Sequence, residues 1–318
     1  MDFRVLLYYC YAPIDDPAAF AEAHHRLCVE LRLLGRIIVA HEGINGTVSG
    51  RAADCEAYMA AVHADPRFAA CEFKVDEVPA HTFGRLRVRV KPEIVHSGLR
   101  NLKPWERTAP YVEPREFEAL RNDPDVVLLD VRSRYEHEVG HFRGAVTLPI
   151  ENFRELPAHG GELRELRERV QGKKVITYCT GGVKCEKASA WLLEQGFENV
   201  YQLHGGIIRY GLETGGEDFE GKCYVFDDRL TVDVNHVNPV VVGACHVCGT
   251  ASDRLINCAN AACNAHLIVC RACGDQLEGA CSEECRTHPQ KRPYDGTGFY
   301  PRQLNGYDPA LSLQRYRK

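Results

Sequence analysis

A glycine-rich loop that begins at a cysteine is the first feature of this sequence that could do chemistry. In the stretch YCTGGVKCEKAS, Cys179 follows an apolar run and precedes Thr180, Gly181 and Gly182. Glycines allow successive backbone N–H groups to point at one anion, and the N-terminus of a following helix adds partial positive charge. Both effects favour the thiolate, which is the attacking form of cysteine. Cys179 is therefore a candidate nucleophile, although a buried cysteine before an ordinary turn fits the same letters.

Val183, Lys184 and Cys185 complete the candidate active-site loop. Lys184 would also favour the thiolate if its ammonium group folds back over the loop. Cys185 has two interpretations: a resolving thiol that attacks a sulfur or sulfenate on Cys179, or a small buried residue in the first helical turn that points away. We expect Cys185 to be the small buried residue that points away from Cys179.

Eight further cysteines form four close pairs within 41 residues. A tight turn between two cysteines presents both sulfurs to one ion, which suits tetrahedral Zn²⁺, and four thiolates make a closed structural site. The array therefore predicts two structural zinc sites, and it leaves open whether the pairs combine sequentially or in a crossed pattern. The predicted ligands are Cys245, Cys248, Cys258, Cys263, Cys270, Cys273, Cys281 and Cys285.

The loop at Cys179 needs a sheet to position it. Between residues 109 and 216, strand-like and helix-like segments alternate, which is typical of a mainly parallel α/β sheet. DVVLLDVRS and KKVITYCTGG are predicted strands, and the second runs directly into the loop. At the end of the first strand, Asp130 and Arg132 are expected to form an ion pair that braces the sheet and orients the loop, rather than to act in catalysis.

Residues 1–94 carry a different pattern. FRVLLYYCYAPI predicts a strand, residues 17–34 a helix, and RIIVAHEGINGTVSG two strands around Gly43, Asn45 and Gly46, with Asn45-Gly46 as a strong turn signal. A second helix near residues 52–64 and the strands in CEFKVDEV and RLRVRVK complete a βαββαβ order. That order predicts a ferredoxin/acylphosphatase-like α/β sandwich.

A basic strip lies on the last of these strands. Because side chains alternate across a strand, Arg85, Arg87, Arg89 and Lys91 fall on one face and apolar residues on the other. The strip is a candidate nucleic-acid contact, and a solvated sheet face fits the same pattern equally well. We therefore treat residues 1–94 as a candidate RNA-binding domain.

The remaining segments are a linker at residues 95–108 and a zinc-binding region at 217–318 that ends in a basic tail. From Arg286 to Lys318 there are seven basic and two acidic residues, so this tail is +5 and the rest of the chain is -10. Such asymmetry is typical of a polyanion contact or of a solvated tail.

Composition narrows the class of protein. The chain has 318 residues, and none of its apolar runs approaches the roughly 18 residues that span a bilayer, so no membrane association is expected. Fifteen cysteines without a secretion signal indicate reduced thiols and a cytoplasmic location. There is no GxGxxG or Walker motif, so we expect no nucleotide or flavin cofactor. Nothing in the sequence implies a protein partner.

The segment from Leu128 to Gly211 resembles a rhodanese domain. LLDVRSRYEHEVGHFRGAVTLP, the CTGGVK loop and GFENVYQLHGGIIRYG follow the order and spacing of that family. The resemblance implies a sulfurtransferase-type α/β fold in which Cys179 can carry a persulfide. Many rhodaneses have arginine where this chain has Lys184, which is a point charge without bidentate geometry. Related phosphatase loops are one residue longer and end in arginine, where this chain has Cys185, so phosphatase activity is not expected.

Over nearly its full length, the chain resembles the rhodanese-containing tRNA uridine hydroxylases. HEGINGTVSG, CTGGVKCEKAS, YVFDDRLTV and the terminal cysteine array occur in the order of that family. The resemblance implies an oxidoreductase that uses molecular oxygen to convert the wobble uridine, in the anticodon loop of certain tRNAs, to 5-hydroxyuridine, with Cys179 essential. The alternatives are a sulfurtransferase that carries a persulfide from a sulfane-sulfur donor to an acceptor, and a non-catalytic zinc-stabilised binding protein.

Overall fold

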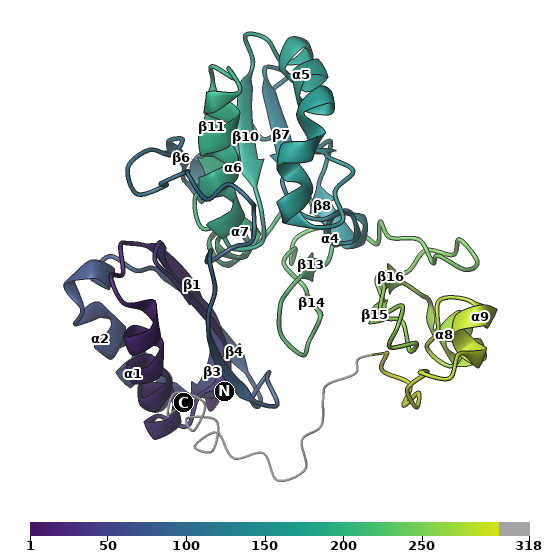
Figure 1. The fold of residues 1–318 in the computed structure, drawn as a ribbon. Helices are drawn as coiled ribbons and strands as arrows, with labels where there is room; N and C mark the ends of the chain where they lie inside the picture. Colours follow the sequence, from purple (N-terminus) through teal and green to yellow (C-terminus); the bar gives the residue numbers. More distant parts are fainter. Residues whose placement is uncertain (299–318) are drawn as a thin grey trace. The chain divides into compact units, whose positions relative to one another are not determined.

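The computed structural model describes residues 1–298, which form two compact units. One unit contains Met1–Thr108 together with Phe226–Asp228. The other contains Ala109–Val225 and the described residues from Arg229 onward. Each unit has its own sheet and its own buried cluster, as Figure 1 shows. Among the described residues, none of the helices combines the length and the apolar character needed to cross a bilayer.

The first unit is a two-layer α/β sandwich, so this part of the predicted fold class is confirmed. Its five-stranded sheet has the order β4-β1-β3-β2-β5, in which only β2 and β5 are parallel neighbours. The first four strands and two helices form the predicted βαββαβ core, and β5 is an additional edge strand beside β2. In chain order the elements are β1 (Phe3–Tyr11), α1 (Pro17–Glu30), β2 (Leu34–Ala40), β3 (Gly43–Arg51), α2 (Ala52–His63), the short 3-10 helix η1 (Pro66–Phe68), β4 (Phe73–Val78) and β5 (Leu86–Val90).

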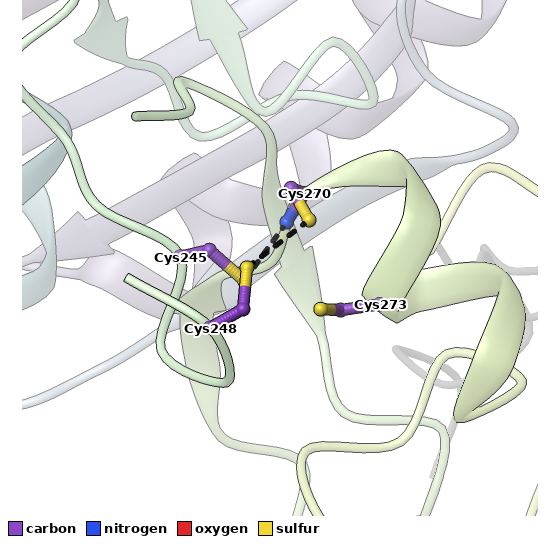
Figure 2. A group of neighbouring side chains, drawn as sticks. All are labelled: Cys245, Cys248, Cys270 and Cys273. Atoms are coloured by element: carbon purple, nitrogen blue, oxygen red, sulfur yellow. Dashed lines mark hydrogen bonds between the residues drawn. The ribbon is translucent and has the colours of Figure 1, made fainter. Parts of the chain in front are cut away.

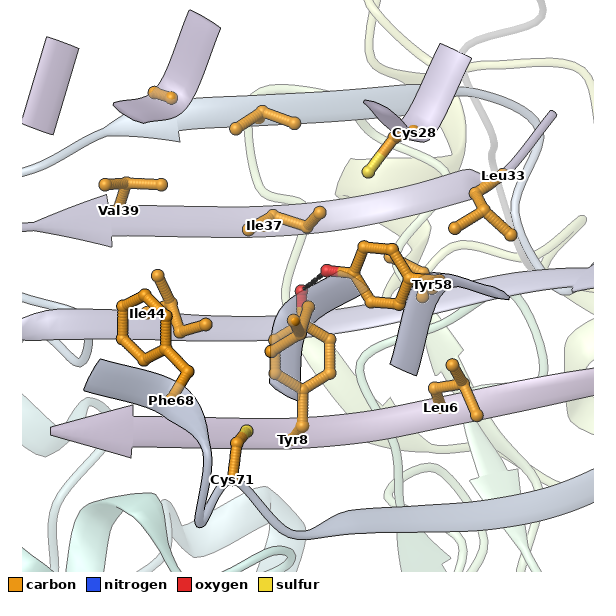
Figure 3. Packing of buried hydrophobic residues seen from close by; sticks show 14 of the residues in the cluster. Leu6, Tyr8, Cys28, Leu33, Ile37, Val39, Ile44, Tyr58, Phe68 and Cys71 are labelled. Atoms are coloured by element: carbon orange, nitrogen blue, oxygen red, sulfur yellow. Dashed lines mark hydrogen bonds between the residues drawn. The ribbon is translucent and has the colours of Figure 1, made fainter. Parts of the chain in front are cut away.

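The core of this unit lies between the two helices and one face of the sheet (Figure 3). Tyr8 of β1 and Tyr58 of α2 are fully buried, and their hydroxyl groups are hydrogen-bonded to each other. The Tyr58 hydroxyl also lies 2.7 Å from Nε2 of His24 on α1. Burial, aided by neighbouring His25, lowers the pKa of His24 to about 4, so the imidazole is neutral at pH 7. The polar groups in this apolar layer are therefore uncharged and hydrogen-bonded to one another.

The turn expected around Gly43, Asn45 and Gly46 lies earlier in the chain, so Gly43 adjoins it but the Asn45-Gly46 signal is wrong. Both residues lie inside β3, paired with Tyr9 and Tyr8 of β1, and the chain turns instead between Ala40 and Gly43. A side chain at Gly46 would collide with the Tyr8 hydroxyl, so the glycine is required by packing rather than by turn geometry. The Asn45 side chain donates to the carbonyl of Ile94 at 2.9 Å, a contact that local turn statistics do not contain.

The second unit contains the predicted parallel sheet, in the order β6-β11-β10-β7-β9. Helices α3 and α7 share a hydrophobic cluster with Ile176 and Tyr178 of β10, and α6 packs against β10 and β11. The elements are β6 (Tyr111–Val112), α3 (Pro114–Leu120), β7 (Val126–Asp130), α4 (Arg134–Val139), β8 (Gly140–Phe142), β9 (Val146–Thr147), η2 (Phe153–His159), α5 (Gly160–Arg169), β10 (Lys174–Tyr178), α6 (Val183–Glu194), β11 (Val200–Leu203) and α7 (Gly206–Thr214).

The rest of this unit consists of short elements joined by irregular chain. Its described residues form three two-stranded pairings: β12 with β8, β13 with β14, and β15 with β16. Such short strands bury little surface, so the cysteine-rich segment needs another source of stability. The elements are β12 (Phe219–Gly221), β13 (Cys223–Tyr224), β14 (Thr231–Val232), β15 (Leu255–Asn257), β16 (His266–Ile268), α8 (Arg271–Gln276) and α9 (Glu283–Thr287).

Candidate functional site

The loop at Cys179 joins the carboxyl end of β10 to the N-terminus of α6. Gly182 has a φ of 101°, in the left-handed region that glycine adopts without strain. This conformation turns its N–H toward the cysteine, and it donates to Sγ of Cys179 at 3.2 Å. The N–H of Lys184 makes a second hydrogen bond to the same sulfur. Thr180 and Gly181 supply the intervening backbone, so the loop forms an anion-binding concavity beneath one sulfur.

A second helix N-terminus fixes the other side of the loop. The N–H groups of Ile207 and Ile208 in α7 donate to the carbonyls of Cys179 and Thr180 at 3.0 and 3.1 Å. Any side chain at Gly206 would collide with these two carbonyls, so only glycine permits the approach. With its carbonyl groups held by α7, the loop keeps its N–H groups free for the sulfur. Gly206 belongs to the HGG motif of the sequence, His204 to Gly206. That motif could have indicated a close approach of the backbone to the loop, but sequence reasoning assigned it no role.

Lys184 does not reach over the loop as an unpaired cation. It lies in the first turn of α6, nearly buried, and its Nζ forms an ion pair with Oε2 of Glu136 at 2.7 Å. Glu136 is fully buried in α4, where the same oxygen also accepts from the backbone N–H of Ser133. Sequence reasoning missed Glu136, although Ser133 and Glu136 have the spacing of a capping box.

Cys185 is fully buried, as expected. The expectation that it points away from Cys179 is not confirmed, because hydrogen bonding from its side chain is among the causes that lower the pKa of Cys179. Its own N–H donates to the carbonyl of Gly182 at 2.9 Å, which fixes it in the first turn of α6. Burial and the adjacent Cys179 sulfur raise the pKa of Cys185, so Cys185 stays a thiol and donates the hydrogen bond.

These contacts decide the protonation state of Cys179. Burial raises the pKa of its thiol, since the residue is only 1% exposed. The hydrogen bond from Cys185, the positive charge of Lys184 and the N–H groups of Lys184 and Gly182 act in the opposite direction. Together they outweigh burial and lower the pKa of Cys179 to about 6. The sulfur is therefore mainly a thiolate at pH 7.

The expected ion pair between Asp130 and Arg132 is present beside this loop. Arg132 Nε and Nη2 donate to the two Asp130 carboxylate oxygens at 2.9 and 2.7 Å, and both side chains are fully buried. Arg132 Nη2 also donates to the carbonyl of Gly140 at 2.6 Å, which ties β7 to β8. Neither residue has a described contact with the sulfur of Cys179, and the geometry supports a bracing role.

The eight clustered cysteines form two groups of four. In each group the sulfur atoms all lie within 4.8 Å of one another, an arrangement that could hold a metal ion. Cys245 and Cys248 face Cys270 and Cys273 at the start of α8, as Figure 2 shows. The other group joins the pair at Cys258 and Cys263 to the pair at Cys281 and Cys285. The first pair thus combines with the third and the second with the fourth, which is the crossed pattern.

The basic strip lies on β5 and on the residues that flank its two ends. Arg85 and Arg87 are half-buried, whereas Arg89 and Lys91 are exposed. Arg36 of β2 is paired with Arg87 in the sheet and therefore projects from the same face. Since Leu86 and Val88 belong to the core under α1 and α2, this basic face is the one that the helices leave uncovered. Part of the basic tail, Arg302, Arg315, Arg317 and Lys318, lies outside the described residues.

Replacing Lys184 should raise the pKa of Cys179. In Lys184→Gln the cation is lost, and we expect the midpoint to move from about 6 upward by about one unit or more. The difference in thiolate ultraviolet absorbance between each protein and its Cys179→Ser counterpart, followed against pH, measures this midpoint. Lys173→Gln, a partly buried lysine next to the opposite end of β10, is the matched control. Identical midpoints in all three proteins would contradict the role given to Lys184.

Comparison with known proteins covers both units. Residues 3–94 match the family model described as the UPF0176 acylphosphatase like domain, residues 113–211 the Rhodanese-like domain, and residues 220–286 the Rhodanase C-terminal model. The tRNA uridine(34) hydroxylase of Cytophaga hutchinsonii is 61% identical over 99% of both chains. Proteins of the same name from Staphylococcus epidermidis and Bacillus mycoides are 48% and 46% identical over 91–92% of each chain. The chain therefore belongs to the tRNA uridine(34) hydroxylase family.

Proposed function

We propose that this protein hydroxylates uridine 34 of tRNA, the wobble position of the anticodon loop, to 5-hydroxyuridine with molecular oxygen. The observation that carries the proposal is the likeness to tRNA uridine(34) hydroxylases along 99% of the chain. The site supports it, because Cys179 is ionised by two backbone N–H groups, Cys185 and Lys184. The bases of an anticodon loop are unpaired and can be flipped toward such a site.

The thiolate supplies the activation that uracil needs. Carbon 5 of uracil does not react with oxygen unaided. Addition of the Cys179 sulfur to carbon 6 forms a C–S bond and moves the ring's electron pair onto carbon 5, which then attacks oxygen. Cys179 is 1% exposed, so side chains around the loop must move aside before the base can reach the sulfur. We infer that tRNA binding and exposure of the thiolate are linked.

Substitution of the nucleophile tests the function directly. Cys179→Ser should lower formation of 5-hydroxyuridine by about a thousandfold or more, since a hydroxyl at this position is not ionised at pH 7. Nucleoside analysis of tRNA incubated with purified protein in oxygenated buffer measures this. The control is Cys28→Ala, which removes a buried thiol from the core of the first unit. Full hydroxylation by Cys179→Ser would contradict the mechanism.

The same assay separates the sulfurtransferase alternative. A persulfide carrier also uses a thiolate at this position, so the loop alone does not discriminate between the two activities. Unchanged tRNA together with strong thiocyanate formation from thiosulfate and cyanide would favour the sulfurtransferase. Loss of 5-hydroxyuridine in cells that lack the protein favours the hydroxylase.

We propose that the basic face of the first unit binds the tRNA backbone. Arg36, Arg87 and Arg89 project from the sheet face opposite the helices, and Arg85 and Lys91 extend the strip. Phosphate contacts of this kind are not specific for sequence and weaken with salt. The cytoplasm, where tRNA is used, is the location we propose.

Neutralising two residues of the strip should weaken tRNA binding in a salt-dependent way. For the double variant Arg87→Gln, Arg89→Gln we expect the slope of log affinity against log salt to fall by about one to two, because roughly 0.7–0.9 counterion is released per phosphate contact. Filter binding at several salt concentrations measures it. Arg26→Gln is the control, since Arg26 is exposed on α1, the layer on the opposite side of the sheet. Equal slopes for both variants would refute the contact.

We propose that each cysteine group holds one Zn²⁺. Sulfurs bound to zinc at about 2.3 Å in a tetrahedron lie about 3.8 Å apart. The Sγ atoms of Cys248 and Cys270 are 3.7 Å apart, and those of Cys263 and Cys281 are 3.8 Å apart. The donor set and spacing therefore fit zinc, and its role is structural because all four ligand positions are filled by protein. Zinc would supply the stability that the short strands of this segment lack.

Metal content of paired variants tests the crossed arrangement. Cys248→Ser with Cys270→Ser removes two ligands of one site, so we expect about one zinc per chain to remain. Cys248→Ser with Cys263→Ser removes one ligand from each site, so we expect the content to fall toward zero. Elemental analysis of the purified proteins gives the result. Sequential pairing would produce the reverse pattern.

A further inference from the structure

The hairpin of β15 and β16 is packed on both of its faces. On one face, Ile256 belongs to a cluster with Cys245 and Cys273, two members of one cysteine group. Leu255, the residue before it, points to the opposite face and belongs to a different cluster. This second cluster draws its residues from α4, β13, β15 and β16; they are Tyr135, Val139, Tyr224, Leu255 and Ile268. The hairpin therefore joins a cysteine group to α4 and β13.

Three aromatic rings contact one another where the hairpin meets these two elements. The ring centroid of His266 on β16 lies 4.9 Å from that of Tyr135 on α4 and 6.0 Å from that of Tyr224 on β13. The two tyrosine rings meet edge to face at 5.3 Å. Nδ1 of His266 is buried without a hydrogen-bond partner in the described part of the chain, and burial lowers the pKa of this residue. The imidazole is therefore neutral at pH 7 and acts here through packing rather than through charge.

α4 makes the first connection from this cluster to the Cys179 loop. Glu136 follows Tyr135 and is fully buried, and its Oε2 lies 2.7 Å from Nζ of Lys184. The other carboxylate oxygen, Oε1, has no hydrogen-bond partner among the described residues. A small shift of α4 would separate this buried carboxylate from the ammonium group that compensates its charge, which is costly. The position of the Lys184 charge beside Cys179 therefore depends on the position of α4.

β13 makes the second connection. The hydroxyl group of Thr180, the residue after Cys179, donates to the carbonyl of Tyr224 at 3.3 Å. Thr180 is nearly buried, and its own carbonyl accepts from the N–H of Ile208 on α7. The loop is thus held on one side by α7 and on another by the residue whose ring packs against the hairpin. Both contacts fix the backbone that directs N–H groups at the sulfur.

We propose that the β15–β16 hairpin holds the Cys179 loop in its reactive geometry, and that His266 is the positioning residue of this contact. His266 acts through Tyr135, which adjoins the partner of Lys184, and through Tyr224, which accepts the hydrogen bond from the loop. The inference rests on the proposed hydroxylase function for its effect on catalysis, because it concerns the sulfur that attacks uracil. The cysteine-rich segment then contributes to the reaction by fixing the two elements that hold the loop.

Titration of the Cys179 thiol tests the proposal without tRNA. In full-length, metal-loaded His266→Ala, we expect the thiolate midpoint to rise by about half a unit to one unit, because α4 and Tyr224 lose the ring that holds them. The difference in thiolate absorbance between each protein and its Cys179→Ser counterpart gives the midpoint. His266→Phe keeps a flat ring and should restore the original value. The control is His236→Ala, which removes an exposed histidine of the same unit.

The pH dependence of hydroxylation gives the second measurement. At pH 6 and saturating tRNA, His266→Ala should form 5-hydroxyuridine about two- to fivefold more slowly than the unaltered protein, since a smaller fraction of the sulfur is ionised. At pH 8 the thiolate dominates in both proteins, so the two rates should nearly agree. Filter binding should show the same affinity for tRNA. A protein that is merely less well folded would lose activity at both pH values.

A second variant tests the contact independently of the His266 ring. Thr180→Val removes the hydroxyl group that donates to Tyr224 but keeps the shape of the side chain, so it should also raise the midpoint. Should His266→Ala fail to fold, an unchanged midpoint in Thr180→Val would overturn the proposal.

Equal midpoints in His266→Ala and His236→Ala would overturn the proposal and leave the hydroxylase function standing. So would a raised midpoint that His266→Phe does not restore, or one that elemental analysis shows to accompany loss of metal. Absence of 5-hydroxyuridine with the unaltered protein would overturn the proposed function instead. The thiol titration would still decide whether the hairpin positions the loop.

Discussion

The chemistry of this protein depends on the balance between burial and local hydrogen bonding at one sulfur atom. A cysteine that is 1% exposed should be neutral, because burial penalises the charged form. Two backbone N–H groups, a neighbouring thiol and a lysine reverse that preference at Cys179. The pKa of Cys179 is lowered from the ordinary thiol value of 9.0 to about 6. This shift corresponds to a free energy of roughly 4 kcal/mol in favour of the thiolate. The groups responsible must therefore be held firmly, since small displacements would return the sulfur to its neutral form.

Buried ion pairs hold these groups in place. Lys184 is anchored by Glu136, and the end of β7 is anchored by the pair of Asp130 and Arg132. Removing one partner of such a pair leaves an unpaired buried charge, which commonly costs about 3–5 kcal/mol. The pairs therefore gain little stability in themselves, but they make alternative positions of the loop costly. α7 acts in the same direction, because its first N–H groups hold the loop carbonyls away from the sulfur.

The sequence was informative where function depends on local spacing. The glycine-rich loop and the alternating strands and helices are encoded within short windows, and so are the cysteine pairs. The features that the sequence could not show depend on contacts between residues that are far apart in the chain. The crossed pairing of the cysteines follows from how β15, β16 and α8 bring separate turns together. The partner of Lys184 lies 48 residues away. The misassigned turn at Asn45-Gly46 has the same origin, since packing of Tyr8 against Gly46 overrides a strong local signal.

Burial of the thiolate has a functional consequence as well as an energetic cost. An exposed thiolate would be open to irreversible oxidation by any small oxidant. With Cys179 and Cys185 both enclosed, the sulfur meets other reactants only when the surrounding side chains move. If a flipped base is what moves them, the reactive sulfur is exposed only when uracil is present to receive it. The same enclosure excludes water from the site, and this strengthens every electrostatic contact that keeps the sulfur ionised.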